Sequence, residues 1–228
     1  MAVRDEFMTV EGRGQLSRFV HCPTCHQTFT GLLLLEMHRR MWRRYRDAPA
    51  SDHARKAFMS VVLALINFGE EDAANELREE ALRGLPRDHR NVLEFEVLRA
   101  EMLFKSHPDK SHEMLDGLRE RMQRCDDASV RSRFESALAV ALTNKGRVEE
   151  ALPFAARGAK LAVVAHGPES MSALGSLGRY AGLLFFTGRA DESRSLLTRL
   201  LATKTRVLGA DHPDTKNTKA TIDRLFPS

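Results

Sequence analysis

The clearest pattern of apolar and polar positions in the chain lies between residues 167 and 214. Apolar residues recur there every three or four positions in two successive stretches, which is typical of amphipathic helices with one buried face. A turn around Gly188 separates the two stretches, so the sequence predicts a helical hairpin. The residues expected to face each other are Leu174, Leu177, Ala181 and Leu184 in the first helix and Ser193, Leu196, Leu197, Leu200 and Leu201 in the second.

Two short segments predict the starts of the first helices of consecutive hairpins. They are Gly167–Ser170 and His212–Thr215, and they begin 45 residues apart. Each contains a proline where the first turn of a helix is expected, because a first-turn N–H would have no intrahelical partner. An acidic residue follows each proline, near the positive end of the helix dipole. The sequence therefore predicts that the hairpin unit begins again near residue 212.

The turn of this hairpin recurs upstream as an internal repeat. Copies with glycine are anchored at Gly69, Gly146 and Gly188, and a weaker copy without glycine is anchored at His107. The anchors are 38, 39 and 42 residues apart, and such a period is typical of stacked helix pairs. A small residue five positions after the anchor predicts close approach of the two backbones, and an apolar residue eight positions after it fills the layer. The small residues are Ala74, Ala151 and Ser193, and the apolar ones are Leu77, Leu115, Phe154 and Leu196.

The phrase RVLGADHPDT at residues 206–215 resembles the segment between repeats in tetratricopeptide-repeat (TPR) proteins of the kinesin-light-chain-like type. The units of that family are longer than the common 34-residue TPR. The resemblance extends over roughly residues 52–226, with two degenerate middle repeats. It implies an all-α, right-handed α-solenoid of about four TPR-like helix hairpins with a C-terminal capping helix. It also implies a concave surface that holds a peptide or partner protein, and it does not imply an enzyme.

The sequence predicts helices and no strand, and it suggests three domains. These are an N-terminal arm over residues 1–20, a module with a basic helix over 21–50, and a TPR-like solenoid over 51–228. Pro49 marks the second boundary, because proline disfavours helix at the residue before it. Helices are expected at about residues 30–46, 53–68, 71–84, 89–105, 108–124, 128–145, 148–165, 169–186, 190–208 and 213–225.

Composition adds few constraints. Of the 228 residues, 43% are apolar and 29% are charged, and the net charge is only +4. The charges of both signs are interleaved, so nucleic acid is not the expected partner. Three cysteines and the absence of a signal-peptide pattern favour a reducing, cytoplasmic location. The sequence contains no glycine-rich phosphate loop, no G-x-S-x-G and no H-E-x-x-H, and we therefore expect no catalytic activity.

Cys22 and Cys25 form a C-x-x-C turn that is the main candidate for chemistry in the chain. Two thiolates at this spacing suit one tetrahedral metal ion, usually zinc, and His38 lies where a zinc finger has its third ligand. Positions 42–44, where a second histidine would follow, hold other residues, so the fourth ligand is not identified. One alternative is a metal-free pair of structural thiols. The segment also resembles a module that precedes kinesin-light-chain-like repeats in uncharacterised proteins of unicellular eukaryotes, in which case His38 is an ordinary helix residue. A redox role is disfavoured because no βαβ pattern surrounds the pair.

The run from His38 to Arg46 contains five arginines with Trp42 and Tyr45 between them. Such a run could bind phosphates, with the rings stacking on bases. The alternative, which we favour, is a solvated helix face whose arginines lie near the negative end of the helix dipole. Trp42 is either a contact that docks this helix on the first repeat or a partly exposed residue.

In a TPR superhelix the first helix of each pair lines the concave face. Asparagine side chains there can both donate to and accept from the backbone of an extended peptide, and cationic side chains favour an acidic partner. Counting back from the turn anchors places five polar or basic residues on this face. They are Lys56, Asn67, Lys105, Arg133 and Asn144.

We therefore expect a non-catalytic scaffold or adaptor for protein–protein interaction that binds a peptide or partner protein in the superhelical groove. Two other functions stay open at this point. One is a zinc-stabilised nucleic-acid or ubiquitin-pathway module that the repeats target. The other is a structural subunit of a larger complex, which would bind through its convex face or its N-terminal arm.

Overall fold

The computed structural model describes residues 31–45, 52–67 and 70–227, which form eleven helices and no strand. The chain divides into two compact units, residues 1–85 and 86–228, and each is described by itself. Unit 1 contains α2 (Gly31–Tyr45), α3 (Asp52–Asn67) and α4 (Glu71–Leu82). In it, α3 packs on both α2 and α4. The three domains predicted from the sequence, residues 1–20, 21–50 and 51–228, stay predictions.

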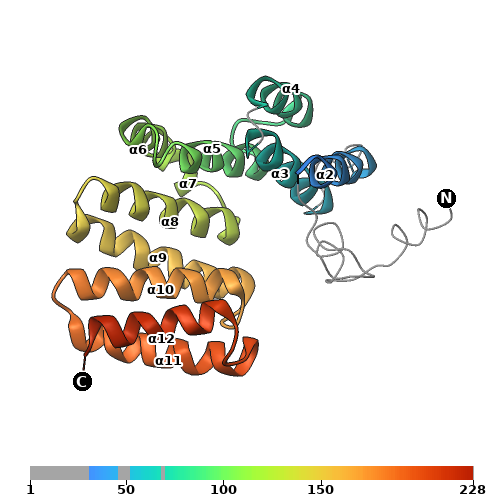
Figure 1. The fold of residues 1–228 in the computed structure, drawn as a ribbon. Helices are drawn as coiled ribbons and strands as arrows, with labels where there is room; N and C mark the ends of the chain where they lie inside the picture. Colours follow the sequence, from blue (N-terminus) through green and yellow to red (C-terminus); the bar gives the residue numbers. More distant parts are fainter. Residues whose placement is uncertain (1–30, 46–51, 68–69, 228) are drawn as a thin grey trace. The chain divides into compact units, whose positions relative to one another are not determined.

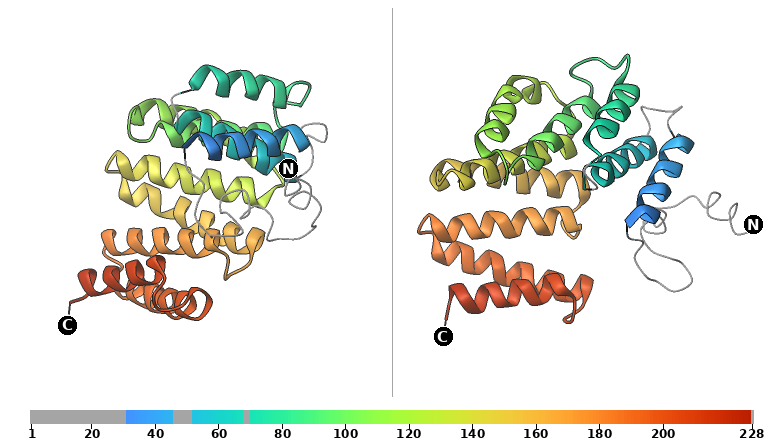
Figure 2. Two further views of the ribbon diagram at one scale, coloured as in Figure 1. Left: turned by 45° about the vertical axis from the view of Figure 1, so that its right-hand side comes forward. Right: turned by 45° about the horizontal axis from the view of Figure 1, so that its top comes forward.

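Unit 2 contains the other eight helices. From α8 to α12 each helix packs on the next one in the chain, and Figures 1 and 2 show these five helices as a stack. Helices α5 and α6 pack on each other and on α8. No helix in the described part is long and apolar enough to cross a membrane. The helices of unit 2 are α5 (Arg90–Met102), α6 (Pro108–Gly117), α7 (Arg119–Gln123), α8 (Ala128–Asn144), α9 (Val148–His166), α10 (Met171–Phe186), α11 (Ala190–Leu208) and α12 (Pro213–Leu225).

Helix α2 is amphipathic, and its apolar face is buried. Met41 and Trp42 are buried, while Arg39 and Arg40 are exposed. The Trp42 ring lies 5.6 Å from the ring of Phe58 on α3. Trp42 therefore docks α2 on the first helix of the first repeat, as one of the two interpretations predicted, and its ring is not available for stacking on a base.

Two glycines set the sharp turns of the last two hairpins. Gly146 and Gly188 have φ of 73° and 78°, a left-handed conformation that a side chain would strain. The N–H of the next residue bonds a carbonyl five positions earlier, at 3.0 Å from Arg147 and 2.8 Å from Arg189. This is the closure of a helix C-terminus that glycine favours, and it confirms the predicted turns.

The turn at His107 lacks a glycine and is one residue shorter. The His107 N–H bonds the Leu103 carbonyl, only four positions earlier, at 2.8 Å. As a result, the small residue that faces the first helix is Ser111, four residues after the anchor. The sequence count therefore misplaces the second helix of this repeat by one residue.

Close approach of the two helices in a hairpin is directly visible at the small-residue position. The Ser193 hydroxyl donates to the Ala181 carbonyl, and the Ser111 hydroxyl donates to the Ala100 carbonyl, both at 2.7 Å. Both serines are fully buried, as is Ala151 at the matching position of the hairpin between them. The prediction that a small residue lets the backbones approach is confirmed.

The predicted core of the α10–α11 hairpin is confirmed for most of its members. Leu174, Ala181, Leu197 and Leu200 form one buried cluster, and Leu177 and Leu196 pack partly buried against it. A larger cluster joins α5, α6, α8 and α9 within unit 2. With hairpins α3–α4, α5–α6, α8–α9 and α10–α11 and the final helix α12, the predicted class, an all-α solenoid of TPR-like hairpins with a capping helix, is confirmed.

Two local predictions are wrong. Pro168 does not lie in a first turn, because α10 begins at Met171 with Ser170 as its N-cap, whose hydroxyl accepts from the Ala173 N–H at 3.2 Å. The N-cap in register with Ser170 is His212, 42 residues later, and Pro213 is the first-turn proline that the sequence predicted there. The single helix expected at 108–124 is interrupted at Leu118, whose N–H bonds the Leu115 carbonyl at 3.1 Å, directly after the weak helix former Gly117.

Replacing two mid-helix glycines by alanine should have opposite effects on the stability of the protein. A Cβ at Gly158 would lie 2.8 Å from Ser136 Oγ and 3.1 Å from Ser136 N. Gly158→Ala therefore forces α8 and α9 apart and should lower the free energy of unfolding by about 1–3 kcal/mol. A Cβ at Gly182 meets nothing within 4 Å, so Gly182→Ala should raise the free energy of unfolding by about 0.5–1 kcal/mol through its higher helix propensity. Urea unfolding followed by circular dichroism measures both. Equal effects of the two variants would contradict the packing described for α8 and α9.

Candidate peptide-binding groove

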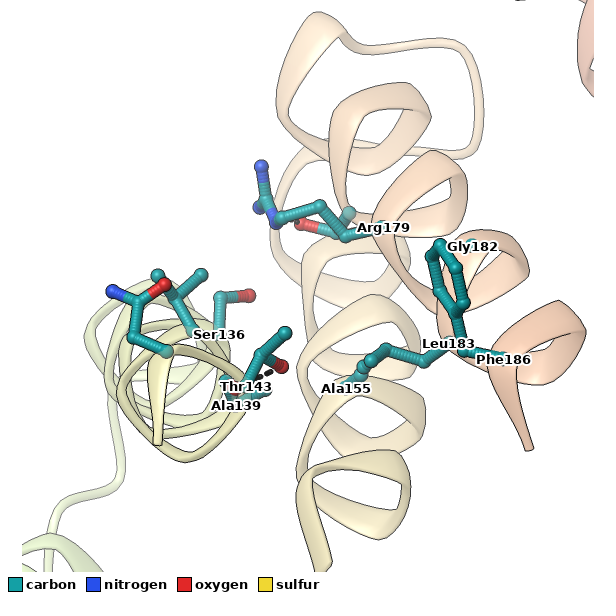
Figure 3. A pocket seen from close by; sticks show the side chains of 11 residues that line it. Ser136, Ala139, Thr143, Ala155, Arg179, Gly182, Leu183 and Phe186 are labelled. Atoms are coloured by element: carbon teal, nitrogen blue, oxygen red, sulfur yellow. Dashed lines mark hydrogen bonds between the residues drawn. The ribbon is translucent and has the colours of Figure 1, made fainter. Parts of the chain in front are cut away.

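A pocket of about 220 Å³ opens between α8 and α10, the first helices of two consecutive hairpins (Figure 3). Ala155 of α9, the helix between them in the chain, also lines it. The lining is mostly apolar, with a few polar groups. The residues from α8 are Ser136, Ala139, Val140, Thr143 and Asn144, and those from α10 are Ser176, Arg179, Gly182, Leu183 and Phe186.

Small side chains create the hollow. Gly182 has no side chain, and a Cβ built there would meet no atom within 4 Å. Across from it, α8 contributes Ala139 and Ser136. Because larger residues at these positions would fill the space between the helices, the composition of the two facing surfaces keeps the pocket open.

Phe186 is an exposed aromatic residue in the lining of the pocket. Its side chain is 69% exposed although it is large and apolar. Its ring stacks edge-on against that of Phe185, with 5.7 Å between ring centroids. An exposed apolar side chain beside a mostly apolar hollow is typical of a surface that binds a partner.

Arg179 is the cation of the pocket. Its Nη2 donates to Ser176 Oγ at 3.0 Å, and within the described residues no carboxylate lies within the 4 Å of an ion pair. Arg179 as a whole is exposed, but partial desolvation of its guanidinium lowers its pKa, and the charge of Glu101 on α5 partly opposes this. A guanidinium without an ion-pair partner can bind a carboxylate from a ligand, with two parallel hydrogen bonds.

Three of the five residues predicted for the groove have described side chains, and their environments differ. Asn144 lines the pocket. Lys105 is exposed and occupies the same position in its hairpin as Asn144 and Phe186 do in theirs. Each of the three lies five residues after an equivalent alanine, which is Ala100, Ala139 and Ala181 in turn.

Arg133, by contrast, points to α5 rather than into the pocket. Its Nη2 lies 2.6 Å from Glu101 and its Nη1 lies 3.8 Å from Glu94. Lys56 and Asn67 belong to α3, but their side chains are outside the described part. Partner binding by these five residues stays a prediction.

Residues 172–214 match a family model, the tetratricopeptide repeat. This segment contains nearly all of the hairpin α10–α11, where the sequence pattern is clearest, and ends at the second residue of α12. No curated protein sequence matches the chain. The match confirms the TPR part of the resemblance that the sequence predicted.

Solved structures that are similar to the chain include two of TPR-like repeats of a Podosopora anserina protein named for kinesin light chain. One has a TM-score of 0.50 at 18% identity and covers 76% of this chain and 86% of that one. The other has a TM-score of 0.48 at 17% identity with the same coverage. At this identity the first likeness shows the fold alone, a TPR-type array.

The sequence count missed three of the pocket residues that matter most: Arg179, Gly182 and Phe186. One signal was present for Phe186, which stands two residues before Gly188 as Asn144 stands two residues before Gly146. The other two carry no comparable signal, because their role depends on what α8 places opposite them.

His38, the predicted third zinc ligand, lies buried in unit 1. Burial lowers its pKa, and a hydrogen bond with the backbone of Ser60 on α3 opposes this. Nδ1 is buried and has no hydrogen-bond partner. Cys22 and Cys25 are outside the described residues, and within those residues no group of three metal-ligating side chains comes together. Zinc binding therefore stays a prediction.

The lowered pKa of His38 predicts that unit 1 loses stability in acid. Below the ordinary pKa of about 6.5, the unfolded chain takes up a proton that the folded unit resists, so the free energy of unfolding falls as pH falls and is unaffected well above 6.5. Urea unfolding of metal-free, chelator-treated protein at about pH 7.5 and about pH 5.5, followed by the fluorescence of Trp42, the only tryptophan, measures this effect.

The variant His38→Gln should show a smaller pH dependence than the wild type. His107→Gln is the matched control, because His107 is exposed in unit 2 and makes no side-chain cap bond. An unchanged pH dependence in His38→Gln would show that His38 is not the group responsible.

Proposed function

We propose that this chain is a non-catalytic scaffold that binds a peptide or a segment of a partner protein in the groove between α8 and α10. The observation that carries the proposal is the open, mostly apolar pocket beside the exposed ring of Phe186. The pocket lies between the first helices of consecutive hairpins, the surface that the TPR resemblance assigns to ligands. A cytoplasmic location stays part of this proposal, from the cysteine content alone.

The charges around the pocket favour an acidic partner. Arg179 has no carboxylate partner among the described residues, and Lys105 stands exposed in the same register as Asn144 one hairpin earlier. Asn144 adds an amide that can pair with a peptide backbone. A peptide that places an apolar side chain in the pocket and a carboxylate on Arg179 fits all of these groups.

We further propose that zinc is bound by Cys22, Cys25 and His38. The hydrogen bonding of His38 favours this proposal. Its Nδ1 has no hydrogen-bond partner, and the hydrogen bond with the Ser60 backbone therefore involves the other ring nitrogen. Histidines that bind metals commonly donate their second N–H to a backbone carbonyl. A lowered pKa also keeps the imidazole neutral, the form that binds metal. Zinc would stabilise the N-terminal segment and would supply no catalytic step.

Filling the pocket should weaken peptide binding without unfolding the protein. Peptides would be selected from a random display library on the wild-type protein, and their affinities would be measured by fluorescence anisotropy. Gly182→Leu places a side chain in the space that a ligand needs, so binding should weaken roughly ten- to hundredfold, the equivalent of one lost buried side chain. The control is Gly117→Leu, where a Cβ also meets nothing within 4 Å but lies at the end of α6.

The same selection tests the charge of the partner. The peptides should be rich in Asp and Glu, and selection on Arg179→Glu should lose this enrichment. Lys160→Glu is the control, because it makes the same change of charge at an exposed position of α9 outside the pocket. Peptides selected on Lys160→Glu should still be rich in Asp and Glu. Peptides that bind Gly182→Leu as tightly as wild type would place the binding site elsewhere.

Zinc binding predicts a simple stoichiometry. Protein purified without chelator should contain about one zinc per chain by elemental analysis, and Cys22→Ser should lose it. His38→Gln should weaken retention of zinc against a chelator, because one ligand is gone. Cys125→Ser is the control, since that thiol is buried in unit 2 and its pKa is raised by burial. Wild-type protein that is free of zinc after purification in zinc-supplemented medium would refute the proposal.

A further inference from the structure

The contact between α11 and the final helix α12 is more polar than the equivalent contact one hairpin earlier. Lys204 and Thr215 are buried where α11 meets α12. The residues 42 positions earlier, on α9 and α10, are Ala162 and Ala173, and both are buried. The same helix–helix contact is therefore made with apolar atoms inside the array and with polar atoms at α12.

These polar groups are incompletely satisfied. Lys204 is only 8% exposed, and its Nζ donates to Thr218 Oγ1 at 3.0 Å and, at the longer distance of 3.5 Å, to the Asp214 carbonyl. Thr215 Oγ1 is buried with no partner. Water would satisfy these groups if α12 moved away, so burying them opposes the docking of α12. Alanine at the earlier contact carries no such cost.

Apolar contacts hold α12 in place against this cost. Ile222, Leu225 and Phe226 pack partly buried against the cluster of Leu197 and Leu200. They lie in the last turn of α12 and just after it. The start of the helix thus carries the polar contacts, and its end carries the apolar ones.

The last of these residues is linked to the groove through one intervening ring, that of Phe185. The Phe226 ring meets the Phe185 ring edge-on at 5.4 Å, and Phe185 in turn meets Phe186 at 5.7 Å. The guanidinium of Arg194 lies over the Phe226 ring, 4.7 Å from its centroid. A continuous set of ring contacts therefore runs from the end of α12 to the exposed ring in the pocket lining.

We propose that α12 is a releasable cap, and that Phe226 is a positioning residue for the groove. With α12 docked, Phe226 fixes Phe185 and so restricts the ring of Phe186. When α12 separates from α11, that restriction is lost and the edge of the pocket becomes mobile. The link to ligand binding rests on the proposed function of the groove, but the release of α12 and its effect on Phe186 do not require a ligand.

Hydrogen exchange measured by mass spectrometry on the full chain tests the release. The amides of α12 should exchange at least about tenfold faster than those in the middle of α10, because α12 opens locally while the array stays folded. The double variant Lys204→Met and Thr215→Val replaces the polar groups by apolar ones of similar shape and should slow α12 selectively. Exchange of α12 at the rate of α10, or no slowing in the double variant, would overturn the proposal.

A fluorine label tests the positioning role. With 4-fluorophenylalanine at position 186, Phe226→Leu should change the ¹⁹F chemical shift or linewidth while the exchange of α9 to α11 stays as in wild type. Phe154→Leu is the matched control, since Phe154 is also a partly buried ring with an arginine over it but lies on α9. An unchanged ¹⁹F signal in Phe226→Leu would overturn the proposal. Because no peptide is present, these results are independent of the peptide selection.

Discussion

The close approach of two helices within each hairpin is the constraint on which the rest of unit 2 depends. In the α10–α11 hairpin the Ser193 hydroxyl bonds the backbone carbonyl of Ala181 directly. Only a side chain of this size can stand there, since a larger one would push the helices apart and separate the leucines around it. The same contact recurs at Ser111 and, with alanine, at Ala151. Each hairpin is therefore a unit of fixed thickness that the next one can pack against.

Fixed hairpins also explain why a pocket forms. Helix α9 packs on both α8 and α10. The pocket walls that α8 and α10 contribute contain small residues, and Gly182 leaves room for a ligand atom. The surface that results combines an apolar hollow with one cation and one exposed ring. These are the groups that the proposed peptide would contact.

Several charges near these helices are already paired with an opposite charge of the same or the neighbouring hairpin. Arg133 pairs with Glu101, Lys145 lies 2.9 Å from Asp109, and Arg206 lies 2.6 Å from Glu169. These exposed or half-exposed pairs contribute little stability each, but they remove the charges from competition for a ligand. Arg179 differs from these residues, because it has no carboxylate partner in the part of the chain that the structure describes.

The sequence by itself determined most of the helices, the turns at Gly146 and Gly188 and most of the core of the α10–α11 hairpin, because periodicity, helix caps and glycine conformations are local properties. The predicted turn at Gly69 lies outside the described residues. It failed where a local signal was ambiguous: Pro168 resembled a first-turn residue, and the missing glycine at His107 hid a turn one residue shorter.

Only the tertiary structure decided which groove residues are free. Arg133 and Arg179 are both arginines on first helices, yet a carboxylate on α5 binds the first, whereas within the described ranges only a serine hydroxyl bonds the second. Whether a charge is available depends on which side chains the neighbouring helix places within a few ångströms, and no pattern along one helix contains that information.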